Sequence, residues 1–211
     1  MELEEQIKQA LAELRKDEGV TRKFDQTADL IINLQKFDLK KNQLNIFIQV
    51  PWKIKDKKIC GFLETKNSAV ETITPSEFKN YSDKKSLKKL VNKFDFFIAQ
   101  ASVMPKVATA FGRVLGPAGK MPSPQLGILI DVNDRAIEEI KKKINNSVRI
   151  RAKEASVKLA IGKQSMADKE ITENVMAVYN AVMKDLSKGK ENIKNIEVKF
   201  TMTKPIKIKV R

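Results

Sequence analysis

The sequence predicts an α+β protein of two domains, one of which is inserted into the other. Hydrophobic residues repeat at every second position near both ends of the chain, and each of these regions also contains one amphipathic helix. In the middle, short apolar runs alternate with helical patterns. We therefore expect residues 1–53 and 153–211 to form a split domain with an antiparallel sheet and two helices. Residues 54–152 are expected to form an inserted three-layer, Rossmann-like α/β domain.

The N-terminal segment contains one predicted helix and two predicted strands. Apolar residues recur every three or four positions in residues 2–16, which is typical of an amphipathic helix, and Gly19 ends this pattern. Apolar residues then alternate with polar or opposite-face residues in residues 28–34 and 43–50, which predicts two strands. We expect these two strands to pair with each other, with Pro51 closing the pair.

The middle segment alternates predicted strands and helices. Apolar runs at 57–64, 69–73 and 94–100 are typical of short buried strands. Only ETKNSA lies between the strand that ends near Leu63 and the run VETI, which leaves no room for a full helix there. Helical patterns follow at 82–94, 104–115 and 133–144.

The C-terminal segment returns to the pattern of the N-terminal one. VKLAIG, which ends at Gly162, predicts a strand, and residues 168–186 predict a long amphipathic helix that Gly189 stops. Two closing strands are predicted at 196–202 and 205–210. Together with the N-terminal strands, these segments supply the sheet of the split domain.

The charge of the chain indicates a polyanionic partner. Its formal net charge is +15, from 41 lysines and arginines against 26 aspartates and glutamates. Such an excess repels itself unless a polyanion balances it, and nucleic acid is the expected partner. A membrane surface is less favoured, because no predicted helix combines a basic face with a bulky aromatic one. No apolar run approaches the roughly 20 residues needed to span a bilayer.

The residue types that are scarce exclude several kinds of site. The chain has no histidine and one cysteine, Cys60, so histidine-based catalysis and zinc sites of histidine or cysteine are excluded. The single cysteine predicts an intracellular protein in which Cys60 is a small buried apolar residue. We expect no catalytic residue, metal or cofactor. The alternative is a Mg²⁺-dependent nucleotide-binding or phosphoryl-transfer enzyme that uses the α/β insert, with Asp95 and Asp131 as candidate carboxylates.

The stretch FGRVLGPAGKMPSP, residues 111–124, superficially resembles a phosphate-binding loop. A phosphate loop needs G-x-x-x-x-G-K-[ST], but here Val114 replaces the first glycine and Met121 the final hydroxyl residue. Its three prolines also remove backbone N–H donors. We therefore expect a glycine-bent, proline-stiffened loop at the hinge-facing edge of the insert. Arg113 and Lys120 are expected to hold the two domains apart at the hinge or to make a secondary RNA contact.

Four stretches of the chain resemble the L1 family of large-subunit ribosomal proteins, and its archaeal members in particular. They are KFDQTADL at 23–30, residues 104–124, IGKQSM at 161–166 and VKFTMTKP at 198–205. The resemblance covers essentially the whole chain. It implies a non-catalytic, cytoplasmic, ribosome-associated constituent of the large subunit that is a monomer when free. It further implies that the protein binds rRNA, organises the mobile stalk beside the tRNA exit site, aids tRNA release and represses its own messenger RNA.

The resemblance also implies which residues contact RNA, all of them in the split domain. Short polar side chains and backbone groups suit the shallow groove of structured RNA, lysines reach phosphates, and apolar side chains pack on a base or ribose. In strands, however, phenylalanine, methionine and threonine serve as core or ordinary strand residues as often as they contact RNA. The implied RNA-binding residues are Lys23, Phe24, Thr27, Asp29, Gly162, Lys163, Ser165, Thr201, Met202 and Thr203.

One of these residues departs from the family pattern. Glycine is usual where Thr203 stands, and glycine would let RNA approach the backbone closely. A branched side chain there is expected to weaken RNA binding or to shift the local contact.

Overall fold

The computed structural model describes residues 2–38, 44–81, 83–130, 132–152 and 154–209. The chain is a mixed α/β protein, as predicted, and it divides into two compact units. Unit 1 contains Met1–Lys55 and Asn146–Arg211, and unit 2 contains Asp56–Asn145. The inserted segment therefore ends at Asn145 and not at residue 152. Within the described ranges, no helix is both long enough and apolar enough to cross a membrane.

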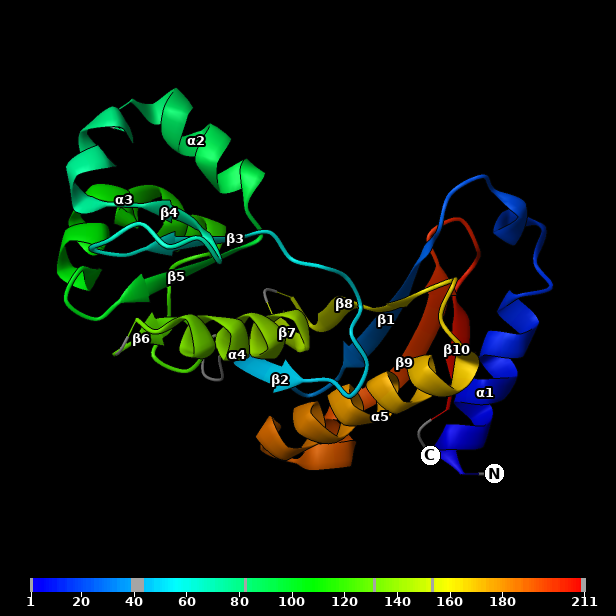
Figure 1. The fold of residues 1–211 in the computed structure, drawn as a ribbon. Helices are drawn as coiled ribbons and strands as arrows, with labels where there is room; N and C mark the ends of the chain where they lie inside the picture. Colours follow the sequence, from blue (N-terminus) through cyan, green and yellow to red (C-terminus); the bar gives the residue numbers. More distant parts are fainter. Residues whose placement is uncertain (1, 39–43, 82, 131, 153, 210–211) are drawn as a thin grey trace. The chain divides into compact units, whose positions relative to one another are not determined.

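A four-stranded antiparallel sheet forms the centre of unit 1 (Figure 1). Its strand order is β10-β9-β1-β8, so β1 lies between two strands that come much later in the chain. Successive residues of β1 alternate between buried and half-buried, because one face of the strand meets the core and the other does not. The strands are β1 (Thr27–Leu34), β8 (Ser156–Lys163), β9 (Ile193–Phe200) and β10 (Ile206–Ile208).

Helices α1 (Leu3–Leu14) and α5 (Asp168–Asp185) bury the core face of this sheet. The apolar residues of α1 fall at the predicted helical spacing, and they join one core cluster with residues of α5 and of β1, β9 and β10. Short 3₁₀ helices at Glu18–Thr21 and Gly189–Asn192 connect these elements. The alternate residues of β1 and β9, among them Asp29 and Lys199, lie on the opposite face of the sheet.

The predicted pairing of the two N-terminal strands is wrong. β2 (Asn45–Gln49) pairs with β7 (Ser147–Arg151), a strand that the sequence analysis did not identify. Ile48 of β2 and Ile150 of β7 both join the core of unit 1. This pairing is the reason that residues 146–152 belong to unit 1 and not to the insert.

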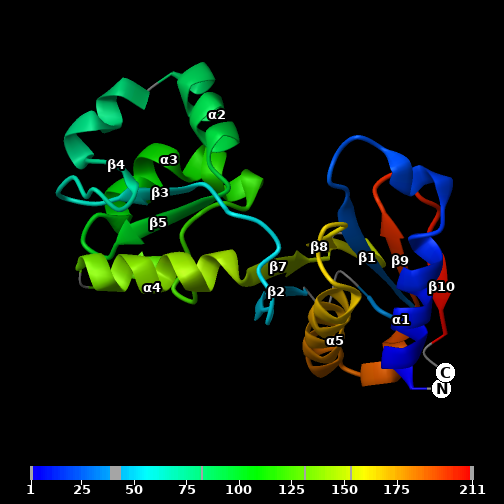
Figure 2. The ribbon, with the colours of Figure 1, turned by 45° about the vertical axis from the view of Figure 1, so that its right-hand side comes forward.

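Unit 2 has a parallel sheet with helices on both of its faces (Figure 2). The sheet order is β4-β3-β5-β6, with β3 (Ile59–Phe62), β4 (Glu71–Ile73), β5 (Phe96–Gln100) and β6 (Ile128–Leu129). Helices α2 (Lys84–Lys93) and α3 (Met104–Ala118) pack on one face, and α4 (Asp134–Asn145) packs on the other.

The connection from β3 to β4 contains no helix, as predicted, and a 3₁₀ helix (Pro75–Tyr81) follows β4. Cys60 of β3 is fully buried, as predicted, and burial raises the pKa of its thiol to about 12. Its thiol therefore stays protonated and unreactive near neutral pH.

The stretch at 111–124 is not a loop over its whole length, because α3 continues to Ala118 and includes Pro117. A proline in the last helical turn removes only one backbone hydrogen bond, and this loss is tolerated there. Gly119 then adopts a left-handed conformation with φ 70°. The N–H of Lys120 donates to Leu115 O, so a glycine-type C-cap ends the helix.

Candidate nucleic-acid interface

Three segments that are far apart in the sequence meet at one end of the sheet of unit 1. They are residues 22–27, 163–166 and 201–204, which we call the loop cluster. Gln26 joins them, although its own side chain is fully buried. The side-chain amide group of Gln26 donates to Gly19 O at 2.7 Å and accepts from the backbone N–H of Met202 at 2.9 Å. The backbone carbonyl of Gln26 accepts from the N–H of Gln164 at 2.7 Å. One buried residue thus fixes the spacing of all three segments.

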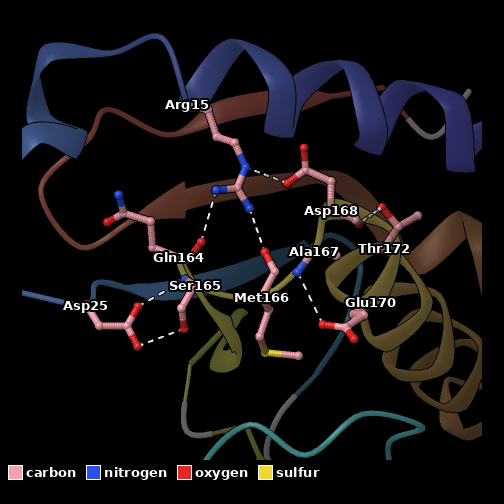
Figure 3. Close-up of polar contacts among 9 residues, drawn as sticks. All are labelled: Arg15, Asp25, Gln164, Ser165, Met166, Ala167, Asp168, Glu170 and Thr172. Carbon is pink, nitrogen blue, oxygen red and sulfur yellow. Dashed lines mark hydrogen bonds and ion pairs between the residues drawn. The ribbon is translucent and has the colours of Figure 1, made fainter.

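Arg15, at the C-terminal end of α1, fixes the segment that leads into α5 (Figure 3). Its guanidinium donates to the Asp168 carboxylate at 2.7 Å and to the carbonyls of Gln164 and Met166 at 2.9 and 2.7 Å. The guanidinium carbon also lies 5.8 Å from the centre of the Phe200 ring. A planar group with several donors is well suited to hold a loop by three contacts at once.

Asp25 holds two of the predicted RNA-binding residues in place. Its carboxylate accepts from the backbone N–H and the hydroxyl of Ser165, both at 3.0 Å, and lies 3.3 Å from Lys163 Nζ. Although desolvation acts to raise the pKa of Asp25, these hydrogen bonds lower it below its usual value. The carboxylate is therefore ionised at neutral pH and orients Ser165 and Lys163.

The outer surface of the loop cluster combines apolar and basic side chains. Phe24 is 51% exposed and Met202 is 49% exposed, which is unusual for large apolar residues. Lys23 is exposed, and Thr201 joins the first segment to the third, since its hydroxyl accepts from the N–H of Thr27 at 3.1 Å. A shallow hollow beside this surface is lined by Asp17, Glu18, Gly19, Thr21, Arg22, Met202 and Lys204. Proteins recognise single-stranded or irregular RNA with exposed apolar side chains that stack on bases and with nearby basic side chains that contact phosphates.

Comparison with known proteins identifies the family. The family model described as "Ribosomal protein L1p/L10e family" matches residues 14–204 of this chain. The chain belongs to that family. Among its relatives, the large ribosomal subunit protein uL1 of Thermoplasma volcanium is 34% identical over 92% of this chain and 91% of its own length. The uL1 proteins of Nanoarchaeum equitans and Thermoplasma acidophilum are 32% and 34% identical, over 90% and 96% of this chain and 94% and 95% of their own lengths.

Membership of the L1 family confirms the predicted resemblance and a ribosome-associated, non-catalytic protein. It decides against the Mg²⁺-dependent enzyme. Of the two carboxylates named for that alternative, Asp95 accepts from the N–H of Lys58, and Asp131 lies outside the described residues. In the part of the chain that the structure describes, no three His, Cys, Asp or Glu residues gather as metal ligands.

Gly162, which the resemblance implied as an RNA contact, is buried in this L1 protein. A Cβ at this position would lie 3.0 Å from Ile171 Cγ1 and 3.4 Å from Met166 Sδ. The space that glycine leaves is therefore filled by the packing of unit 1 itself, which gives Gly162 a structural reason to be glycine.

Thr203 does not project from the loop cluster. Its side chain is only 5% exposed, and its hydroxyl accepts from the N–H of Phe200 at 2.9 Å. The hydroxyl closes the turn between β9 and β10 by turning inward. The expectation that the branched side chain of Thr203 faces RNA and weakens binding therefore loses its structural basis.

The inward hydroxyl of Thr203 leads to a stability prediction. Thr203→Val keeps the shape but leaves the buried N–H of Phe200 without its acceptor, so we expect the free energy of unfolding to fall by about 1–3 kcal/mol. Thr203→Ser keeps the hydroxyl and is the matched control. Urea unfolding measures both variants, and equal stability of Thr203→Val and Thr203→Ser would show that the hydroxyl contributes nothing.

Asp29 lies beside the loop cluster on the face of the sheet that the helices leave uncovered, directly opposite Lys199 of β9. Desolvation raises the pKa of its carboxyl group, and Lys199 acts to lower it. Because the folded-state pKa is above the unfolded one, the ionised carboxylate destabilises the fold at neutral pH. That penalty disappears as the pH falls through the folded pKa toward the ordinary value.

We therefore expect Asp29→Asn to stabilise the protein at pH 7, by about 0.5 kcal/mol or about 1–2 °C in Tm, after allowance for solvent screening. The difference between variant and wild type should vanish as the pH falls below about 4, where the wild-type carboxyl group is also neutral. Thermal unfolding of both proteins between these pH values checks the prediction. A difference that does not change with pH would show that the charge of Asp29 is not its source.

Arg113 and Lys120 lie in unit 2, whereas the loop cluster belongs to unit 1. Arg113 is exposed on α3. Lys120 Nζ donates to the carbonyls of Val91 and Phe94 at 2.6 and 2.7 Å, so it binds the C-terminal end of α2. The structure thus gives Lys120 a role inside unit 2.

The sequence analysis did not assign a role to Arg15, Asp25 or Gln26. Asp25 and Gln26 lie within KFDQTADL, next to residues that it did select. Arg15 gave no comparable signal, because an arginine at the end of an amphipathic helix is usually solvated.

Proposed function

We propose that this chain binds large-subunit ribosomal RNA through the loop cluster of unit 1. The observation that carries this proposal is the exposure of Phe24 and Met202 on loops that hydrogen bonds of Gln26 hold together, beside a third segment that Arg15 fixes. A surface that is already ordered loses little conformational entropy on binding, so its apolar contacts convert efficiently into affinity. Lys23, Lys163 and Lys204 stand on the three segments of the loop cluster and would supply phosphate contacts.

Two further activities would use the same surface. As part of the large subunit, the chain would organise the mobile stalk beside the tRNA exit site and aid tRNA release. Binding a similar RNA structure in its own messenger would repress translation, with rRNA as the competitor. Unit 1 is the RNA-binding domain in this proposal, and the protein is a monomer when free.

The test is a salt titration of affinity for a stalk-region rRNA fragment and for a scrambled RNA of the same length. We expect a preference of at least about 10³-fold for the true fragment, which is the low end of specific recognition. The preference should persist as salt rises, because polar and stacking contacts release few counterions. Equal affinities that fall together in salt would show that only the net charge of +15 binds RNA.

A further inference from the structure

Helix α2 of unit 2 carries a charge pattern that opposes its own stability. Five of its ten residues are lysine and none is acidic. Lys85 stands in the first turn, where the helix dipole favours negative charge, and Lys85 and Lys89 form a like-charge pair four residues apart. Lys85, Lys88 and Lys89 are exposed, and no described carboxylate forms an ion pair with them. Among the lysines of α2 whose side chains the structure describes, only Lys93 has an acidic partner, Glu71.

Helix α4 of the same unit shows the pattern that stability alone would select. Its acidic residues, Asp134, Glu138 and Glu139, precede Lys141, Lys142 and Lys143 along the helix. Apart from Arg135 in the first turn, this order places each sign of charge where the dipole favours it. The lysines of α4 are therefore explained by helix stability and solubility, whereas those of α2 need another explanation.

The lysines of α2 form one continuous face. Leu87, Leu90 and Val91 point into the core of unit 2, which leaves Lys85, Lys88, Lys89 and Asn92 on the outside. We call these four residues the α2 face. At a rise of about 1.5 Å per residue the face is about 10 Å long. Lys120 adds a positive charge at the carboxyl end of the helix, where its amine binds the carbonyls of Val91 and Phe94. The α2 face is thus positive along its length, although the N-cap residue is the acidic Asp83.

We propose that the α2 face is a second RNA-binding surface, which contacts the phosphate backbone without reading its sequence. An acidic protein is a poorer fit, because protein interfaces are depleted in lysine and centred on apolar or aromatic anchors, and the α2 face has none. A membrane surface would likewise need apolar side chains to insert. The inference rests on the proposed function only because unit 1 brings the chain to its RNA.

The experiment compares two triple variants of the full chain. K85Q/K88Q/K89Q removes the charge of the α2 face, and R135Q/K142Q/K143Q removes the same charge from exposed positions of α4. The probe is the stalk-region rRNA fragment with its flanking helices, titrated in about 0.05–0.2 M salt. Each lost phosphate contact reduces the slope of log affinity against log salt by about 0.7–0.9. We expect the α2 variant to lose about 2 from this slope and about tenfold in affinity at low salt, and the α4 variant to retain the wild-type slope.

Thermal unfolding excludes a trivial explanation, because relief of like-charge repulsion should leave the Tm of the α2 variant equal to or above that of the wild type. Equal slopes for the α2 and α4 variants would overturn the proposal, even with the fragment preference of the wild type intact. If the α2 variant binds RNA normally but fails to join large subunits, the α2 face contacts a protein and the proposal is wrong. If the wild-type protein does not prefer the true fragment over scrambled RNA, the proposed function is contradicted. The comparison of slopes between the α2 and α4 variants would still test the α2 face.

Discussion

Replacing both Phe24 and Met202 by alanine is expected to lower the affinity for the stalk rRNA fragment by about 10²-fold or more. Stacking of a base on an aromatic side chain such as Phe24 contributes about 1–3 kcal/mol, and the double variant also removes the exposed apolar surface of Met202. The loss should fall mainly on the true fragment, so the preference over scrambled RNA should shrink as well. Because both side chains are about half exposed in the free protein, their removal should change the free energy of unfolding little.

The control for this variant is Ile130→Ala. Ile130 is 84% exposed and lies in unit 2. Its substitution therefore removes an exposed apolar side chain that is far along the chain from the loop cluster. Fluorescence anisotropy with labelled RNA measures all three proteins. Undiminished preference in the Phe24/Met202 variant would show that the loop cluster does not contact RNA through its apolar side chains.

Arg15→Met is expected to reduce the free energy of unfolding by about 2–4 kcal/mol. The substitution keeps much of the apolar stem but removes donors from two backbone carbonyls and from the Asp168 carboxylate. Loss of a charged donor from a partly buried acceptor lowers the free energy of unfolding more than loss of a neutral donor does. The loop that carries Lys163 and Ser165 should also become mobile, with faster amide exchange at residues 164–167 and weaker RNA binding.

Two companion variants sharpen this prediction. Arg15→Lys keeps the charge but not the planar fork, and it should recover only a minor part of the lost stability. Arg22→Met removes an exposed arginine and should leave the free energy of unfolding nearly unchanged. Urea unfolding measures all three variants. If Arg15→Lys is as stable as the wild type, the charge alone and not the three-point geometry holds the loop.

The elements that follow from local pattern were predictable. The apolar spacing of α1 and α5 and the alternation in β1 and β9 predicted their type, because each element buries one face against a single core. The pairing of β2 was not predictable in the same way. Its partner β7 lies about a hundred residues later, and nothing in five alternating residues indicates a partner across an inserted unit.

The candidate site divides along similar lines. Resemblance to the L1 family pointed to all three segments of the loop cluster, but not to the residues that hold them together. Gln26 acts through hydrogen bonds to Gly19, Gln164 and Met202, and the last two are distant from it in sequence. Thr203 was misjudged because a side chain in a turn can point either way, and only the position of the Phe200 N–H decides which.

The place of β1 between β8 and β9 also sets an order of events in time. Unit 2 is complete once Asn145 has been synthesised, whereas β1 gains its partner β8 only at Lys163 and its partner β9 only at Phe200. At about 5–20 residues per second, these 55 further residues take roughly 3–10 s. Until the end of that interval the sheet around β1 is incomplete, and Gln26 has no Met202 to bind. A nascent chain therefore acquires a folded insert first, and RNA can select only chains whose synthesis has passed the second half of unit 1.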